Sequence, residues 1–100
     1  MEQKYLDMLI AIDKSIKERQ DSFGWGLKLG LALPQKTTGY RIRTSSMTHD
    51  DFFERIDWLA ENGYITIGTG PHSGEWCDIT DSYVETYTLT DLAIETIGRG

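Results

Sequence analysis

Apolar side chains near the start of the chain recur at the period of a helix. Tyr5, Leu9, Ile12 and Ile16 are separated by four, three and four residues, which places them on one side of an α-helix. The spacing predicts an amphipathic helix from residue 2 to about residue 20.

The range 24–33 has two interpretations. Its large apolar residues alternate with glycine, alanine or lysine, which is the period of a half-buried strand. A helix would also align Trp25, Leu29 and Leu33, but three glycines would each cost it about 1 kcal/mol relative to alanine. The strand is therefore favoured, and a hairpin with the alternating range 40–44 is expected. The remaining alternative is a helix over 24–33 that tertiary packing stabilises.

Residues 48–63 predict a second amphipathic helix, with an acidic outer side. At about 100° per residue, its apolar side chains fall within roughly a third of the circumference: Phe52, Phe53, Ile56, Leu59 and Ala60. The other side carries Asp50, Asp51, Glu54, Asp57 and Glu61, with Arg55 and Trp58 among them. Thr48 with Asp51 resembles a capping box, and Gly63 occupies a C-cap position, so both ends are specified.

The remainder of the chain predicts shorter elements. In order, these are a strand at 64–67, a turn region at 68–74, a loop or strand extension at 76–81, a strand at 83–89 and a final helix at 90–97.

This order resembles the second half of winged-helix domains. The resemblance rests on an apolar-periodic helix, the sequence LAENGYITIG, a turn-rich loop and the sequence YTLTDLAIETIG. It implies a recognition helix at 49–62, strand two at 64–68, a wing at 69–82, strand three at 83–89 and a last helix at 90–97. It covers about half of the chain; upstream, the family has a compact helix where this sequence has the glycine-punctuated range 24–33. The expected fold is one α+β, winged-helix-like domain over residues 1–100, with a two-stranded wing and an extra hairpin.

Composition limits the class of protein. One hundred residues, 39% of them hydrophobic, suffice for one core, in a domain that folds alone or as a homodimer. The single cysteine, Cys77, excludes an internal disulfide framework and fits a reducing compartment. The N-terminus lacks the layout of a signal peptide, and no apolar run is long enough for a bilayer. We therefore expect a cytoplasmic protein that does not enter a membrane.

Charge is unevenly distributed along the chain. The net charge is −6, but the range 22–49 has no acidic residue and carries +4, which leaves −10 for the rest. The four cations are Lys28, Lys36, Arg41 and Arg43. They either form a basic patch or pair with the acidic remainder of the same molecule.

No pattern of residues predicts catalysis, a metal or a cofactor. The potential metal ligands are His49, His72, Cys77, Asp78 and Asp81. They match neither a zinc spacing nor a calcium loop, and no nucleophile motif occurs. Carboxylates on an exposed helix are too well solvated to act as general acids. We therefore expect a protein that is not an enzyme.

The acidic helix supplies the leading hypothesis for function. Glu54, Asp57, Trp58 and Glu61 are expected to bind a basic surface of a protein partner, because an exposed tryptophan among charges is typical of an interface anchor. A partner whose basic groove serves nucleic acid would make this chain an inhibitor or regulator. Alternatively, the wing, the N-terminal helix or a second copy of the chain covers Trp58.

The winged-helix resemblance implies the competing hypothesis, a small dimeric DNA-binding transcription regulator. The implied recognition helix offers only Arg55 as a central donor, and the implied wing has no Lys or Arg. DNA contacts would then come from the segment before that helix: Lys28, Lys36, Arg41, Arg43, Ser46 and Thr48. The hydroxyls and amides there precede a helix N-terminus and could hold a phosphate. The alternative for Thr48 is a cap with no ligand.

Overall fold

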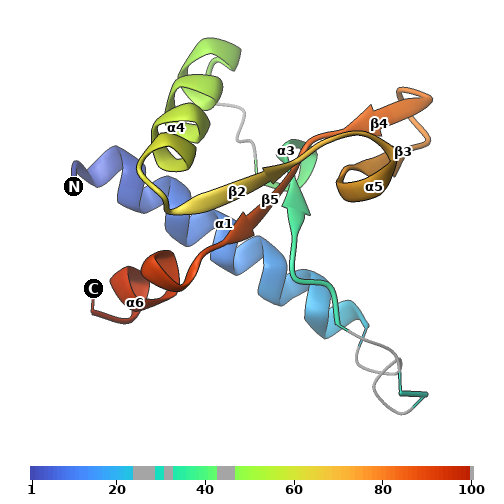
Figure 1. Cartoon of the computed structure of the whole chain (residues 1–100), viewed down its shortest axis with the longest axis horizontal. Helices are drawn as coiled ribbons and strands as arrows, with labels where there is room; N and C mark the ends of the chain where they lie inside the picture. Colours follow the sequence, from blue (N-terminus) through green and yellow to red (C-terminus); the bar gives the residue numbers. More distant parts are fainter. Residues whose placement is uncertain (24–28, 31–32, 43–46, 100) are drawn as a thin grey trace.

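The protein is a small α+β domain with antiparallel sheets (Figure 1). The computed structural model describes residues 1–23, 29–30, 33–42 and 47–99. In chain order the elements are α1 (Gln3–Ser22), β1 (Thr37–Thr38), α3 (Gly39–Ile42), α4 (His49–Glu61), β2 (Ile65–Gly68), α5 (Gly70–Ser73), β3 (Glu75–Cys77), β4 (Ser82–Val84), β5 (Thr86–Leu89) and α6 (Asp91–Arg99).

Two sheets organise the chain. The first has the order β1-β5-β2, so the late strand β5 lies between two earlier ones. Tyr87 on β5 is the partner of Thr37 on one side and of Ile67 on the other. The second sheet is the β3–β4 hairpin, which projects beyond the ends of β2 and β5 (Figure 1).

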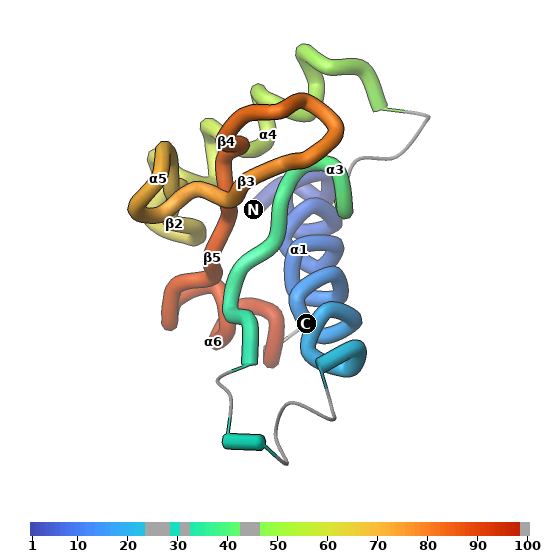
Figure 2. Tube along the Cα trace, turned by 90° about the vertical axis from the view of Figure 1, so that its right-hand side faces the viewer, coloured from blue at the N-terminus to red at the C-terminus, as the bar shows by residue number. Residues whose placement is uncertain are grey.

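The core joins the longest helix to the sheet and to α4. α1 extends along much of the molecule (Figure 2), and its predicted stripe of Tyr5, Leu9, Ile12 and Ile16 is buried. Other elements supply the opposing side chains of the core: Phe52, Ile56, Leu59, Ile65, Tyr87 and Ala93. The predictions of the first helix and of its core-facing side are confirmed.

Both predicted ends of α4 are confirmed. The Thr48 side chain accepts a hydrogen bond from the Asp51 amide at 3.1 Å. At the other end, the amide of Tyr64 donates to the carbonyl of Leu59 at 2.9 Å, and Gly63 adopts φ 79°. Glycine accepts this left-handed conformation without the cost that a Cβ adds.

The predicted strand at 40–44 is wrong, because residues 39–42 form helix α3. The strand of this region is β1, at Thr37 and Thr38, which are buried and pair with β5. The Thr37 hydroxyl is satisfied by Ser15 on α1, with 2.6 Å between the two oxygens. A two-residue strand of buried threonines has no apolar alternation, so its pattern did not reveal it. Most of the range 24–33 lies outside the described residues.

Three further boundaries differ from prediction. The range 83–89 contains two strands, β4 and β5, because Glu85 separates them and each pairs with a different partner. The range 69–82 is more ordered than a loop, since it contains α5 and β3. The last helix continues to Arg99. No helix within the described ranges has the length and apolar character needed to cross a membrane.

Gly68 generates a prediction about stability. A Cβ at this position would overlap the Ser73 carbonyl oxygen and the Thr86 hydroxyl, which are hydrogen-bonded to each other at 2.8 Å. We expect Gly68→Ala to reduce the free energy of unfolding by about 1–3 kcal/mol in urea denaturation. The control is Gly98→Ala in α6, where a Cβ meets nothing within 4 Å. If both substitutions changed the free energy of unfolding equally, steric overlap at position 68 would not be the cause.

Candidate functional site

The outer face of α4 carries a line of carboxylates. Asp50, Glu54, Asp57 and Glu61 are separated by four, three and four residues, and all four are exposed. This spacing places them along one side of the helix, over about 16 Å at 1.5 Å per residue. We call these four residues the acidic stripe. Asp51 is also exposed but lies on a neighbouring side of the helix.

The second half of the stripe, Asp57 and Glu61, does not stabilise α4. Asp50 and Asp51 in the first turn complement the helix dipole, but no basic residue occupies the last turn, where Glu61 lies. Carboxylates spaced by three or four residues also repel each other. Asp57 and Glu61 therefore reduce local stability, so helix formation alone does not account for them.

One carboxylate of the stripe contacts α1. The Tyr5 hydroxyl donates a hydrogen bond to Glu54, and Lys4 Nζ lies 3.8 Å from a Glu54 oxygen. The bond to Glu54 raises the pKa of the Tyr5 hydroxyl, and burial adds to this. Among the described side chains, no cation forms an ion pair with Asp50, Asp57 or Glu61. Most of the stripe is thus open to an external cation.

The expectation that Trp58 projects freely among these carboxylates needs correction. Its ring stacks on Tyr5 of α1, with 4.1 Å between centroids and 7° between planes. It is also nearly parallel to the ring of Tyr64, at 5.9 Å. Trp58 is half-buried and packs against the core. In the structure the N-terminal helix covers Trp58, which was one of the alternatives for this residue.

The described residues of the basic segment contact other parts of the chain. Lys36 Nζ donates to the Ser73 carbonyl at 3.3 Å, and Arg41 donates to Glu75 at 2.9 Å and to Thr38 at 3.2 Å. Thr48 caps α4 through its side chain. The other three residues of the DNA-binding hypothesis, Lys28, Arg43 and Ser46, lie outside the described residues. Arg41 thus pairs with an acidic residue of the same molecule, whereas Lys36 bonds to a backbone carbonyl.

Glu75 connects three elements. Arg19 of α1 and Arg41 of α3 both donate to its carboxylate, which fixes the base of the β3–β4 hairpin. Burial alone would raise the pKa of the Glu75 carboxyl, but the hydrogen bonds from Arg41 and Arg19 outweigh it, so that this pKa is lowered. Arg19 and Glu75 are 56 positions apart, so no local pattern reveals the pair. Correlated substitution among relatives is the signal that could.

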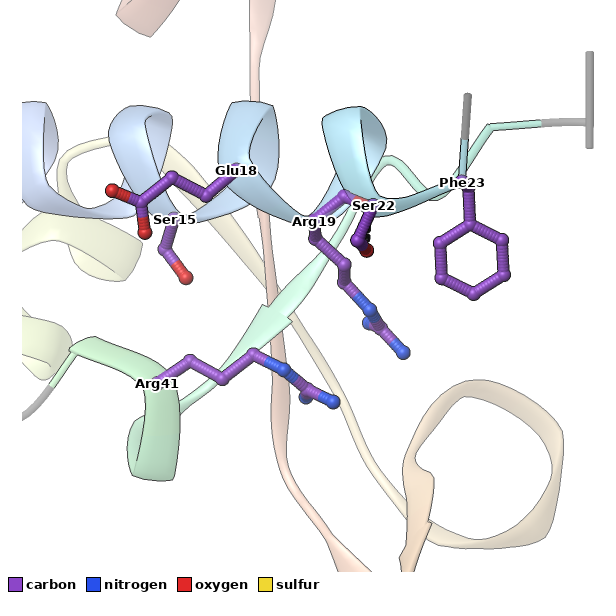
Figure 3. A pocket seen from close by; sticks show the side chains of 6 residues that line it. All are labelled: Ser15, Glu18, Arg19, Ser22, Phe23 and Arg41. Carbon is purple, nitrogen blue, oxygen red and sulfur yellow. Dashed lines mark hydrogen bonds between the residues drawn. The ribbon is translucent and has the colours of Figure 1, made fainter. Parts of the chain in front are cut away.

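The same arginines line an open pocket of about 400 Å³. Its other lining residues are Ser15, Glu18, Ser22 and Phe23 (Figure 3). Both guanidinium groups are bonded to Glu75, and Glu18 forms an ion pair with Lys14. The arginines of the pocket therefore already have a carboxylate partner.

The potential metal ligands are not assembled into a site. Among the described residues, no group of three His, Cys, Asp or Glu side chains is placed to hold a metal ion. Hydrogen bonds from Thr80 lower the pKa of the Cys77 thiol.

Comparisons with protein-family models, with curated proteins and with solved structures give no significant match.

The Glu75 contacts generate a prediction about pH. Because the pKa of Glu75 is lowered in the folded state, its stabilising effect is complete above the pKa of an unpaired Glu, about 4.3, and is lost as the pH falls through the lower, folded value. We expect Glu75→Gln to reduce the free energy of unfolding by about 1–2 kcal/mol at pH 7. The difference from the wild type should shrink below about pH 4. Urea denaturation at several pH values measures both effects.

A matched control is Asp21→Asn, because Asp21 is exposed near the end of α1 and has no cationic partner among the described side chains. It should not lower stability at pH 7. If Glu75→Gln reduced the free energy of unfolding by the same amount at pH 3 and at pH 7, the stabilising role of the Glu75 carboxylate would be contradicted.

Proposed function

We propose that this protein is a non-enzymatic interaction module that binds a basic surface of a protein partner through the acidic stripe of α4. The observation that carries the proposal is the exposure of Asp57 and Glu61 at positions where they weaken their own helix. A partner that supplies cations would reverse this local penalty on binding. Where the partner's basic surface serves a nucleic acid, the protein acts as its competitor or inhibitor.

Electrostatics favours a protein partner over a polyanion. No Lys or Arg occurs in the range 56–98, which includes the end of the stripe and the β3–β4 hairpin. Phosphate binding depends mainly on Lys and Arg replacing counterions. Opposite charges also steer association and raise its rate. The stripe would therefore attract a basic protein and repel DNA.

The proposal includes a winged-helix interpretation of the fold. In its support, Gly63 ends α4, β2 follows, a hairpin connects β2 to β5, and α6 closes the chain. This is the element order on which the resemblance rests. α4 would then occupy the position of a recognition helix, with its charge reversed relative to a helix that reads DNA.

DNA binding by a dimeric transcription regulator is the alternative that this element order favours. Its contacts would have to come from the segment 28–48. Arg41 is one of the few donors there that the structure describes, and it already bonds to Glu75 and Thr38.

Gel retardation distinguishes the two functions. We expect the protein to leave random-sequence duplex DNA unretarded at 50 mM salt, because the exposed face of α4 is negative and both Lys36 and Arg41 are bonded within the protein. Retardation that weakens steeply with salt and is lost in Arg41→Ala would favour the DNA-binding regulator instead.

Neutralising the end of the stripe should affect stability and binding in opposite directions. In the double variant Asp57→Asn with Glu61→Gln, we expect the free energy of unfolding to rise by about 0.5–1 kcal/mol, since dipole and like-charge repulsion are relieved. We expect the same variant to lose partners that the wild type retains at low salt in a pull-down read by mass spectrometry.

The control for charge is Glu18→Gln with Asp21→Asn, which removes two exposed carboxylates from the far end of α1. It should retain the same partners as the wild type. If the stripe variant and the control capture the same proteins, the stripe is not the binding surface.

A further inference from the structure

The β3–β4 hairpin and its turn expose large apolar side chains. Trp76 and Tyr83 are cross-strand partners, and they are 48% and 47% exposed. Their rings meet edge to face, with centroids 5.2 Å apart. Ile79, in the turn between the two strands, is 88% exposed. We call these three residues the hairpin patch. Neighbouring apolar side chains in solvent are typical of a binding surface.

The fold directs this patch away from the body of the protein. Successive side chains of a strand point to opposite faces. Glu75, one position before Trp76, bonds to Arg19 and Arg41 of the body, so Trp76 lies on the other face. The amide of Gly74 donates to the carbonyl of Gly70 at 2.9 Å, which ends α5 immediately before β3. The patch is thus held in place without a partner.

Two carboxylates lie in the turn that carries Ile79. Trp76 Nε1 donates to Asp78 Oδ1 at 3.0 Å, which keeps a negative charge beside the indole ring. Asp81 is exposed in the same turn, and no cation of the described residues pairs with either aspartate. A second copy of the chain would bring the same carboxylates together. Charge complementarity therefore favours a cationic occupant over self-association.

Arginine is the side chain that fits both features. A guanidinium group stacks on aromatic faces and also donates planar hydrogen bonds to carboxylates, whereas ammonium is more strongly hydrated. We propose that the hairpin patch docks an arginine of a protein partner, with an apolar side chain beside it in the partner's sequence. The guanidinium group lies against the rings of Trp76 and Tyr83 and bonds to Asp78, and the apolar neighbour covers Ile79. This site is separate from the acidic stripe and goes beyond the function proposed for it.

The proposal can be tested by NMR titration of the full ¹⁵N-labelled chain with three synthetic peptides. The probes are acetyl-Gly-Leu-Arg-Leu-Gly-amide and the same peptide with lysine or with citrulline, the neutral analogue of arginine. We expect the arginine peptide to shift the Trp76 indole N–H saturably, and the citrulline peptide to bind about five- to tenfold more weakly. The lysine peptide should be intermediate.

Three variants at exposed residues keep the test independent of folding. Ile79→Ser should weaken arginine-peptide binding about threefold or more, whereas Ile94→Ser, at a residue 58% exposed on α6, should leave it unchanged. Asp78→Asn should reduce the preference for arginine over citrulline.

Three results would overturn the proposal. They are equal binding of arginine and citrulline peptides, absence of a saturable shift at Trp76 up to millimolar peptide, and concentration-dependent shifts of the hairpin without peptide, which would indicate a second copy. The stripe variant Asp57→Asn with Glu61→Gln should retain the Trp76 response, so failure of one site is distinguishable from failure of the other.

Discussion

The contact between α1 and α4 is the constraint on which the proposed surfaces depend. Tyr5 stacks on Trp58 and donates to Glu54, so one residue of α1 fixes both the apolar and the charged part of α4. These two contacts set the rotation of α4 about its own axis. With Phe52, Ile56 and Leu59 turned into the core, Asp57 and Glu61 can only face solvent. The direction of the acidic stripe is thus a consequence of packing.

A second set of contacts holds the hairpin against this framework. Glu75 accepts from Arg19 and Arg41, and Thr86 and Lys36 both donate to the Ser73 carbonyl. These bonds join the hairpin region to α1, α3 and the segment around β1. Because the partners are far apart in sequence, they form only when the whole domain is folded. The hairpin is therefore ordered by tertiary structure rather than by its own short strands, since an isolated two-stranded hairpin is only marginally stable.

The sequence predicted the elements that have strong local signals. The period of α1, the cap at Thr48 and the glycine stop at Gly63 each follow from neighbouring residues, and so do the existence of β2 and α6. β1 was missed because buried threonines lack apolar alternation, and α3 was mistaken for a strand. The acidic stripe was visible in the sequence as helical spacing. The cover on Trp58 and the pairing of Arg41 were not, because each depends on a residue more than thirty positions away.

The distribution of ion pairs explains why a protein of modest net charge can have a strongly negative surface. Lys4, Lys14, Lys17, Arg19 and Arg41 all form ion pairs within the protein, so their charge is locally compensated. The range 56–98 has carboxylates without any Lys or Arg. Positive charge is therefore compensated near α1 and α3, while negative charge stays exposed on α4 and the hairpin. Such a separation orients an approaching basic molecule before contact, with an effect that salt reduces over a Debye length of about 8–10 Å.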